Sequence, residues 1–351
     1  MKVRISKTYA LDRVKRILIR GTNWIGDAVM TLPAISAIRK TFPKAEVSIL
    51  AKPWVAEIFN LCKDIDKVIL FQSTGIHSGI GGKMRLAQEL KASGFDMAIL
   101  LQNAIEAAII TRLAGIPIRA GYNSDGRGLL LTHSVQRTEA IRKVHQTAYY
   151  LEMVKSLGCQ SAGTDVRLKP GDDYNVLAED IFDAYGIGRN EVLIGMAPGA
   201  AYGPAKRWFP ERFSAVAERL TNEYSARIIV LGSSQDKGSV DKVQQNSHHH
   251  LINLSGKTNL KEAIAIMARC SLFISNDSGL MHVAGALHIP TVAIFGSTNP
   301  ITTSPTGDKS VVIYKEASCS PCLKETCPTD FRCMDMISVD EVFEVARRLL
   351  K

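Results

Sequence analysis

The sequence predicts an α/β protein with two doubly wound domains, each built on a parallel β-sheet. Short apolar runs bounded by turn residues recur along the chain, and such runs are typical of buried parallel strands. Segments with apolar residues on one helical face separate the runs, so strands and helices alternate. The alternation occurs twice, on either side of a stretch that contains Gly, Ser and Pro but no period. Two alternations joined by a linker indicate two such domains.

The first half of the chain carries five predicted strands with helices between them. Strands are expected at residues 16–20, 46–50, 68–71, 97–101 and 116–121. Helices are expected at residues 28–41, 84–92 and 144–157, and a further helix is expected to end at residue 114. Residues 73–82 are rich in glycine, which predicts a mobile loop able to cover a site.

The second half repeats the pattern. Strands are expected at residues 192–197, 227–231, 271–274 and 291–295, and helices at 176–185, 210–222 and 260–268. Asn259 and Glu262 form a plausible capping box, and Ser338 with Glu341 caps a last helix. Asp277-Ser-Gly279 opens a further helix, which Pro290 ends.

These elements divide the chain into a domain over residues 1–170 and a domain over residues 174–351. The linker is expected at about 159–173, because this stretch has turn residues and no periodicity. A cleft between two such domains is the default place for a ligand.

Charge is distributed unevenly between the two halves. The net charge is +9, yet residues 1–170 carry 25 Lys and Arg against 13 Asp and Glu, while residues 171–351 carry 18 against 21. A basic half indicates an anionic partner, either nucleic acid or an anionic membrane surface with a phosphorylated lipid. The cations are scattered and no aromatic-interleaved RNA motif occurs, which favours the membrane over nucleic acid.

The sequence shows no candidate membrane span. No apolar run approaches the roughly 20 residues that a span needs. The basic amino terminus lacks the apolar core and cleavage site of a signal peptide. We therefore expect a cytoplasmic protein.

The loop after the first strand, Gly21-Thr-Asn-Trp-Ile-Gly-Asp27, matches neither a dinucleotide fingerprint nor a phosphate-binding Walker loop. Asp27 follows a strand directly and is the only carboxylate in this loop. It is either an acid in the first turn of a helix, favoured by the helix dipole, or a general base.

Two loops of the second domain predict a site for a diphosphate. The N–H groups of Gly199, Ala200 and Ala201 follow a strand, and Lys206 adds a positive charge. A second turn follows another strand, at a helix amino terminus that favours an anion. This turn contributes Asp277, Ser278 and Gly279, with His282 one helical turn further on. The alternative is that Asp277 only caps the helix.

Four cysteines cluster near the carboxyl end, namely Cys319, Cys322, Cys327 and Cys333. Their spacing suits zinc or an iron–sulfur cluster, but it also occurs in redox and structural sites. Both interpretations stay open. We expect the cluster to be peripheral to catalysis, because it lies outside the two loops that predict a ligand site.

Three motifs resemble the bacterial lipopolysaccharide heptosyltransferases, and the first of them, with Leu113-Ala-Gly-Ile-Pro-Ile-Arg-Ala-Gly121, looks most like heptosyltransferase II. They are Gly-Thr-Asn-Trp-Ile-Gly-Asp-Ala-Val-Met-Thr-Leu-Pro-Ala (21–34), Ala-Pro-Gly-Ala…Lys-Arg-Trp (197–208) and Ser-Asn-Asp-Ser-Gly-Leu-Met-His-Val-Ala (275–284). They occur in family order, and the similarity covers nearly the whole chain.

The resemblance implies a GT-B fold with two Rossmann-like domains, the acceptor bound by the amino domain and the donor by the carboxyl domain. It implies inverting transfer of heptose from ADP-heptose to the inner-core heptose of lipopolysaccharide, at the inner membrane and with no required cofactor. Asp27 would be the base and Lys206 the diphosphate clamp. Asp236 is the only acid near the place where some members hold the adenosine ribose. The rival hypotheses are a GT-B enzyme with another nucleotide sugar or acceptor, and a non-catalytic nucleotide-binding protein.

Overall fold

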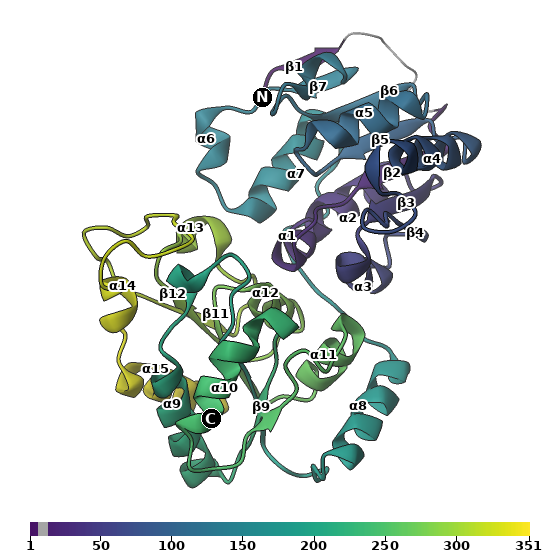
Figure 1. Cartoon of the computed structure of the whole chain (residues 1–351). Helices are drawn as coiled ribbons and strands as arrows, with labels where there is room; N and C mark the ends of the chain where they lie inside the picture. Colours follow the sequence, from purple (N-terminus) through teal and green to yellow (C-terminus); the bar gives the residue numbers. More distant parts are fainter. Residues whose placement is uncertain (6–12) are drawn as a thin grey trace. The chain divides into compact units, whose positions relative to one another are not determined.

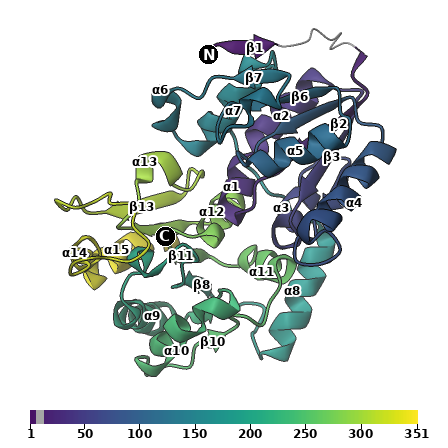
Figure 2. The same ribbon diagram turned by 45° about the horizontal axis from the view of Figure 1, so that its top comes forward.

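The computed structural model describes residues 1–5 and 13–351. The chain divides into two compact units, Met1–Val166 and Arg167–Lys351, so the division falls within the stretch 159–173. Each unit contains one sheet with helices on both faces (Figures 1 and 2). The predicted α/β class with two parallel-sheet domains is therefore confirmed.

The sheet of the N-terminal unit has seven strands in the order β1-β7-β6-β5-β2-β3-β4. Only β1 is antiparallel to its neighbour, and the other described pairs are parallel. The strands are β1 (Val3–Ile5), β2 (Arg16–Arg20), β3 (Glu46–Ala51), β4 (Lys67–Leu70), β5 (Met97–Leu100), β6 (Ile118–Tyr122) and β7 (His133–Val135). The sequence did not predict β1 and β7, because three residues are too few to show a period.

Helices cover both faces of this sheet. In Figure 2, α4 and α5 lie over one face, and α2 and α7 pack together over the other. The helices are α1 (Ile25–Met30), α2 (Leu32–Thr41), α3 (Ala56–Asn60), α4 (Gly79–Ala92), α5 (Ile105–Leu113), α6 (Glu139–Arg142) and α7 (Gln146–Ser156). Short 3₁₀ turns occur at Pro53–Val55 and Arg127–Leu129.

Two predictions for this unit were wrong in detail. The single helix expected over 28–41 is two helices that meet at Thr31, whose Oγ1 donates to the Ala28 carbonyl at 2.6 Å. The glycine-rich loop expected over 73–82 ends early, because α4 already begins at Gly79. A side chain at Gly82 would overlap the backbone of His77, so this glycine permits close packing rather than marking a loop.

The C-terminal unit has a fully parallel sheet of six strands in the order β10-β9-β8-β11-β12-β13. The strands are β8 (Leu193–Ala197), β9 (Arg227–Val230), β10 (Ile252–Asn253), β11 (Leu272–Asn276), β12 (Thr291–Phe295) and β13 (Ser310–Tyr314). The edge strand β13 was not predicted, although an apolar run follows Ser310 within it; in the fold most of its side chains are only partly buried.

Helices α9, α10 and α15 share one apolar core with the strands, while α8 packs against α11. The helices are α8 (Asp172–Ala184), α9 (Pro210–Tyr224), α10 (Lys237–Gln245), α11 (Leu260–Met267), α12 (Gly279–Ala286), α13 (Pro300–Thr303), α14 (Arg332–Asp335) and α15 (Val339–Leu350). Short 3₁₀ turns occur at Pro204–Lys206 and Ser234–Asp236. The capping box of Asn259 and Glu262 is confirmed.

Strand order reverses once in each sheet, between β2 and β5 and between β8 and β11. At such a point the connections leave to opposite sides and open a crevice at the carboxyl ends of the strands, where open α/β sheets bind ligands. Both predicted ligand loops of the second domain, and the loop that leads to Asp27, start at these strands.

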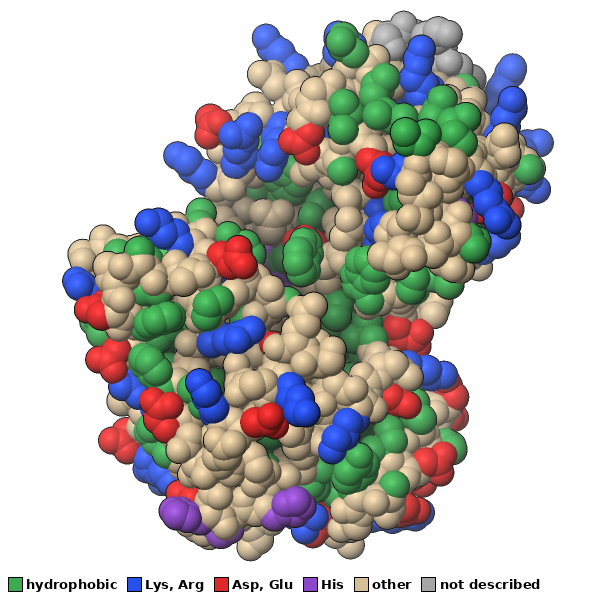
Figure 3. All heavy atoms as spheres, viewed as in Figure 1, with side chains coloured by type: hydrophobic (Ala, Val, Ile, Leu, Met, Phe, Trp, Pro, Cys, Tyr) green, Lys and Arg blue, Asp and Glu red, His purple; other side chains and the backbone are tan. Residues whose placement is uncertain are grey.

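Lys and Arg side chains are scattered over the visible surface of the N-terminal unit, where acidic side chains are few (Figure 3). The C-terminal unit shows both signs interspersed. Within residues 1–5 and 13–351, no helix combines the length and apolar character needed to cross a bilayer.

Candidate active-site residues

The loop after β8 is held at both ends by one buried side chain. Asn276, the last residue of β11, donates from Nδ2 to the Pro198 carbonyl at 2.7 Å and accepts from the Trp208 backbone N–H at 3.0 Å. Trp208 is itself fully buried, with Nε1 bonded to the Ile337 carbonyl. Asn276 thus fixes the loop that carries Gly199, Ala200, Ala201 and Lys206 against the neighbouring strand.

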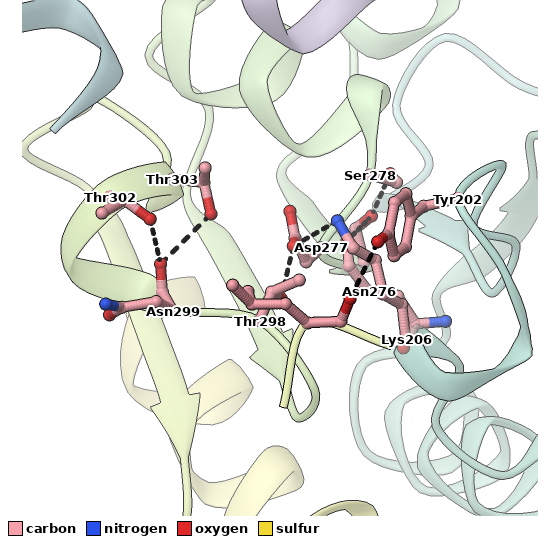
Figure 4. A network of polar contacts seen from close by, with 11 residues as sticks. Tyr202, Lys206, Asn276, Asp277, Ser278, Thr298, Asn299, Thr302 and Thr303 are labelled. Carbon is pink, nitrogen blue, oxygen red and sulfur yellow. Dashed lines mark hydrogen bonds and ion pairs between the residues drawn. The ribbon is translucent and has the colours of Figure 1, made fainter. Parts of the chain in front are cut away.

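Lys206 and Asp277 form a direct ion pair. The distance from Lys206 Nζ to Asp277 Oδ2 is 2.6 Å, and the side chains are 15% and 5% exposed (Figure 4). Thr298, which follows β12, donates to the same carboxylate oxygen at 2.6 Å. The ring of Tyr202 lies 5.1 Å from Nζ. The two predicted loops therefore meet through this ion pair. With Thr298, the contacts connect the ends of three adjacent strands, β8, β11 and β12.

Asp277 does not cap the following helix, so that alternative is wrong. The N-cap of α12 is Ser278, whose side chain makes no capping bond and instead pairs with Ser275 Oγ at 2.9 Å. The first N–H groups of α12 are therefore not occupied by a side-chain cap, and they can bind an anion. Gly279 begins the helix and is half-exposed, whereas His282 is buried within it.

The start of the loop is packed against a buried acid. A side chain at Gly199 would overlap Asp236, which accepts from the backbone and hydroxyl of Ser233. Arg207 lies 3.7 Å from Asp236 and donates to the Ala200 carbonyl at 3.3 Å. In the part of the chain that the structure describes, the N–H groups of Gly199, Ala200 and Ala201 donate to no backbone carbonyl. They can therefore serve an oxyanion.

Sequence reasoning missed three members of this network: Asn276, Thr298 and Tyr202. Thr298 follows a predicted strand at the same sheet edge, so the strand pattern could have identified it. Asn276 and Tyr202 belong to the quoted motifs, but nothing in their spacing indicates which atoms they contact.

Asp27 lies in the first turn of α1 and is half-buried. The loop before it is fixed by Arg20, which is 1% exposed and donates to the carbonyls of Gly21 and Leu50 and to Asn23 Oδ1. Burial raises the pKa of Tyr150 on α7, and the nearby charge of Asp27 raises it further. The structure thus places a carboxylate at the switch point of the first sheet.

The four clustered cysteines line one pocket of about 220 Å³. All seven cysteines are free thiols. Among the described residues, no three Cys, His, Asp or Glu side chains are arranged to hold a metal, so zinc or an iron–sulfur cluster finds no support.

The segment that carries the cysteines also contacts the β8 loop. That the cluster is peripheral to catalysis stays a prediction. The Ala205 N–H donates to the Glu325 carbonyl at 3.0 Å, and Tyr202 donates to the Leu323 carbonyl at 2.9 Å. The cysteines follow the motifs in the sequence, but in the fold their segment packs against the loop of the second motif. This segment therefore supports the loop that ends at Lys206.

Comparison with known proteins links this geometry to one family. Residues 83–331 match the model of glycosyltransferase family 9 (heptosyltransferase). Lipooligosaccharide heptosyltransferase 2 of Haemophilus influenzae is 29% identical over 306 residues, covering 85% of this chain and 88% of that protein. The corresponding protein of Campylobacter jejuni is 25% identical over 342 residues, covering 96% and 98%.

Solved structures agree. The family 9 glycosyl transferase of Veillonella parvula superposes with a TM-score of 0.84 at 25% identity, covering 96% of this chain and 97% of that one. The ADP-heptose lps heptosyltransferase II of E. coli superposes with a TM-score of 0.82 at 24% identity, covering 95% and 98%. The two Rossmann-like units are thus those of a GT-B enzyme. Because the family match spans most of the chain, the protein belongs to glycosyltransferase family 9, the heptosyltransferases, and is a glycosyltransferase.

Proposed function

We propose that the protein transfers L-glycero-D-manno-heptose from ADP-heptose to the inner-core heptose of lipopolysaccharide. One observation supports it above the others: the ion pair of Lys206 and Asp277 lies beside an uncapped helix amino terminus at the switch point of a parallel sheet. A cation and free helix N–H groups at this place in a parallel sheet are the groups that bind a nucleotide diphosphate. The similarity to heptosyltransferase 2 proteins of several bacteria supports the sugar and the acceptor.

The C-terminal unit binds the donor in this proposal. Gly199, Ala200 and Ala201 donate backbone N–H groups to one side of the diphosphate, and Ser278 and Gly279 at the start of α12 serve the other. Lys206 supplies the positive charge, and Asp277 with Thr298 orients its ammonium group. His282 completes the donor pocket.

The N-terminal unit binds the acceptor and supplies the base. Asp27 takes the proton of the acceptor hydroxyl while its oxygen forms a bond to the anomeric carbon. The bond from that carbon to the diphosphate oxygen breaks, and its electron pair leaves with ADP. A single displacement of this kind inverts the anomeric configuration.

The positive charge at the diphosphate comes from Lys206 and from helix N–H groups, so the proposed reaction needs no metal or other cofactor. Prolonged treatment with a chelator should leave turnover and melting temperature unchanged. Activity that disappears on chelation and returns with one metal ion would contradict this part of the proposal.

The function is tested by measuring ADP release from ADP-heptose in the presence of defined core acceptors, with the product identified by mass spectrometry and NMR. We expect one added heptose, with inverted configuration, on an acceptor that ends in the first inner-core heptose. Turnover with another nucleotide sugar alone would favour a different glycosyltransferase. Tight ADP-heptose binding without turnover on any acceptor would favour a binding protein.

We also propose that the enzyme works at the cytoplasmic face of the inner membrane, with the basic N-terminal unit drawn to anionic lipid. Each Lys or Arg near such a surface contributes about 1 kcal/mol, and salt screens the effect. Sedimentation with anionic vesicles should show binding that weakens as ionic strength rises. Binding that ignores salt, or no binding to anionic vesicles, would remove the membrane argument.

A further inference from the structure

Lys52 is a buried cation without a counter-ion among the described residues. It follows β3 directly, and its residue is only 6% exposed. Its Nζ lies 3.6 Å from the centroid of the Phe71 ring and 5.9 Å from that of Trp54. Within residues 1–5 and 13–351, Nζ has neither a hydrogen-bond acceptor nor a carboxylate partner. A charge that is largely withdrawn from water costs free energy unless another group compensates it.

The charges around Lys52 increase this cost. Arg20 and Lys83 are cations, and Glu106, the carboxylate that acts on Lys52 among the described residues, is already paired with Lys83 at 2.7 Å. Burial lowers the pKa of Lys52, and Arg20 lowers it further. Burial also lowers the pKa of Arg20, to about 10. The carboxyl edge of this sheet therefore holds more positive than negative charge, which attracts an anion.

Two further polar groups at this edge lack partners. Thr22 follows β2 and Gln102 follows β5, and β3, β2 and β5 are adjacent strands. The buried Thr22 Oγ1 and Gln102 Oε1 have no hydrogen-bond partner among the described residues. The hydroxyl can donate, and so can the Gln102 amide once its O and N are exchanged. Lys52, Thr22 and Gln102 thus follow three adjacent strands at the same edge of the sheet, and each can donate a hydrogen bond.

Two exposed indole rings flank this edge. Trp54 is 49% exposed and donates from Nε1 to the Asn23 carbonyl at 2.8 Å, and Trp24 is 60% exposed. Exposed aromatic rings beside a cation suit a sugar ring that bears an acidic group, because the apolar face of the sugar packs on the ring. The surplus positive charge disfavours a metal ion.

We propose that Lys52 binds an anionic oxygen group, a carboxylate or a phosphate, on the sugar acceptor. Thr22 and Gln102 complete this subsite, and the charge of Arg20 strengthens it. The proposal rests on the proposed function, in which the N-terminal unit binds the acceptor. It adds a residue that selects acceptors by their acidic groups.

The test compares Lys52→Met and Lys52→Arg with Lys63→Met. Lys63 is exposed and precedes β4, at the opposite edge of the same sheet, so the control removes the same charge elsewhere. Binding of deacylated core oligosaccharide is measured by calorimetry without donor, which separates binding from turnover. Two modified acceptors are included: one without phosphates, and one with its carboxylates reduced to alcohols.

We expect Lys52→Met to weaken binding of the full acceptor about ten- to hundredfold, which corresponds to one hydrogen bond to a charged group. Lys52→Arg should lose less, and Lys63→Met should match the parent. Parent and Lys52→Met should bind equally to the acceptor that lacks the recognised group, which identifies phosphate or carboxylate.

Three outcomes would overturn the subsite. They are a Lys52→Met protein that binds the full acceptor within twofold of the parent, an equal loss on both modified acceptors, and a parent that binds no core acceptor. A parent that binds acceptor through Lys52 but releases no ADP would overturn the proposed function and leave the subsite standing.

Discussion

Two buried lysines lie at the carboxyl edges of the two sheets, and they differ in what neutralises them. Lys206 in the C-terminal unit is paired with Asp277, which Thr298 also contacts. Lys52 in the N-terminal unit lies over aromatic rings with other cations nearby. The first lysine is satisfied within the protein, so removing it leaves a buried carboxylate unpaired. The second is satisfied only when an anion binds, so removing it relieves a cost.

The acids at the two sheet edges are also assigned different roles. The proposed diphosphate site has its own acid, Asp277, to orient Lys206. Glu106, the acid that acts on Lys52 and Arg20, is paired with Lys83 instead, and we assign Asp27 to proton transfer. Substitutions at these positions should therefore affect catalysis, binding and stability in different proportions.

The largest effect is expected for Asp27→Asn. The amide keeps the shape of the carboxylate but cannot take a proton, so kcat should fall about 10²–10⁴-fold with donor affinity nearly unchanged. The matched control is Glu139→Gln, an exposed acid in the first turn of α6, which should behave as the parent. Steady-state kinetics checks this, and near-parental turnover by Asp27→Asn would leave it only as an acid in a helix's first turn.

Lys206→Met should weaken ADP-heptose binding about ten- to hundredfold, because a charge-assisted hydrogen bond to phosphate is lost. It should also lower the free energy of unfolding by about 3–5 kcal/mol, since Asp277 stays buried without its partner. Calorimetry and denaturant titration measure the two effects.

The double variant Lys206→Met with Asp277→Asn tests whether the two effects separate. Stability should return toward the parent because no buried charge remains unpaired, while donor affinity should stay low. A single Lys206→Met variant as stable as the parent would show that the pair does not matter to folding.

Gly203→Ala tests the support of the donor loop by the cysteine-bearing segment. Gly203 has φ of 152°, and a side chain there would overlap Glu325. We expect a loss of about 1–3 kcal/mol in stability, with a rise in donor KM smaller than that of Lys206→Met. Gly238→Ala in α10, where a side chain meets open space, should be neutral or stabilising. An unchanged donor KM for Gly203→Ala would separate the segment from donor binding.

The smallest effect concerns the alkaline stability of Lys52→Met. Because the pKa of Lys52 is lowered by burial, the unfolded chain binds its proton more tightly than the folded protein does. The unfolding free energy of the parent should thus rise relative to the variant as pH increases from the lowered pKa toward about 10.5. The surrounding Arg20, Glu106 and Lys83 are common to both proteins. If the unfolding free energies of the parent and of Lys52→Met change with pH in parallel, the inference that Lys52 is buried without a partner is contradicted.

Sequence alone located the elements whose burial is continuous. The strand at 291–295 has the predicted bounds, because four apolar residues follow Thr291 between Pro290 and Gly296. The start of α4 was missed because its glycines hide a helical period, although packing on His77 explains Gly82. A strand as short as β1 carries too few apolar residues to be recognised, whereas β13 has an apolar run and was missed all the same.

For the candidate site, the sequence predicted which loops meet but not which atoms touch. Parallel strands end at one edge, so the loops of Lys206 and Asp277 were expected to be close. That the two residues neutralise each other depends on side-chain direction across 71 positions of sequence, which no local pattern encodes. The surplus charge at Lys52 was invisible for the same reason, since a missing partner is a property of the fold.

Asn276 has a consequence for the entropy of donor binding. Its single amide closes the chain between Pro198 and Trp208 into a ring. Ordering a flexible backbone costs about 1–2 kcal/mol of conformational entropy per residue. This loop is already ordered in the folded protein, so donor binding does not have to order it. Under the proposed function, a nucleotide sugar meets a preorganised loop, so most of its contact energy can appear as affinity. A donor loop released at either end would have to be ordered anew in every catalytic cycle.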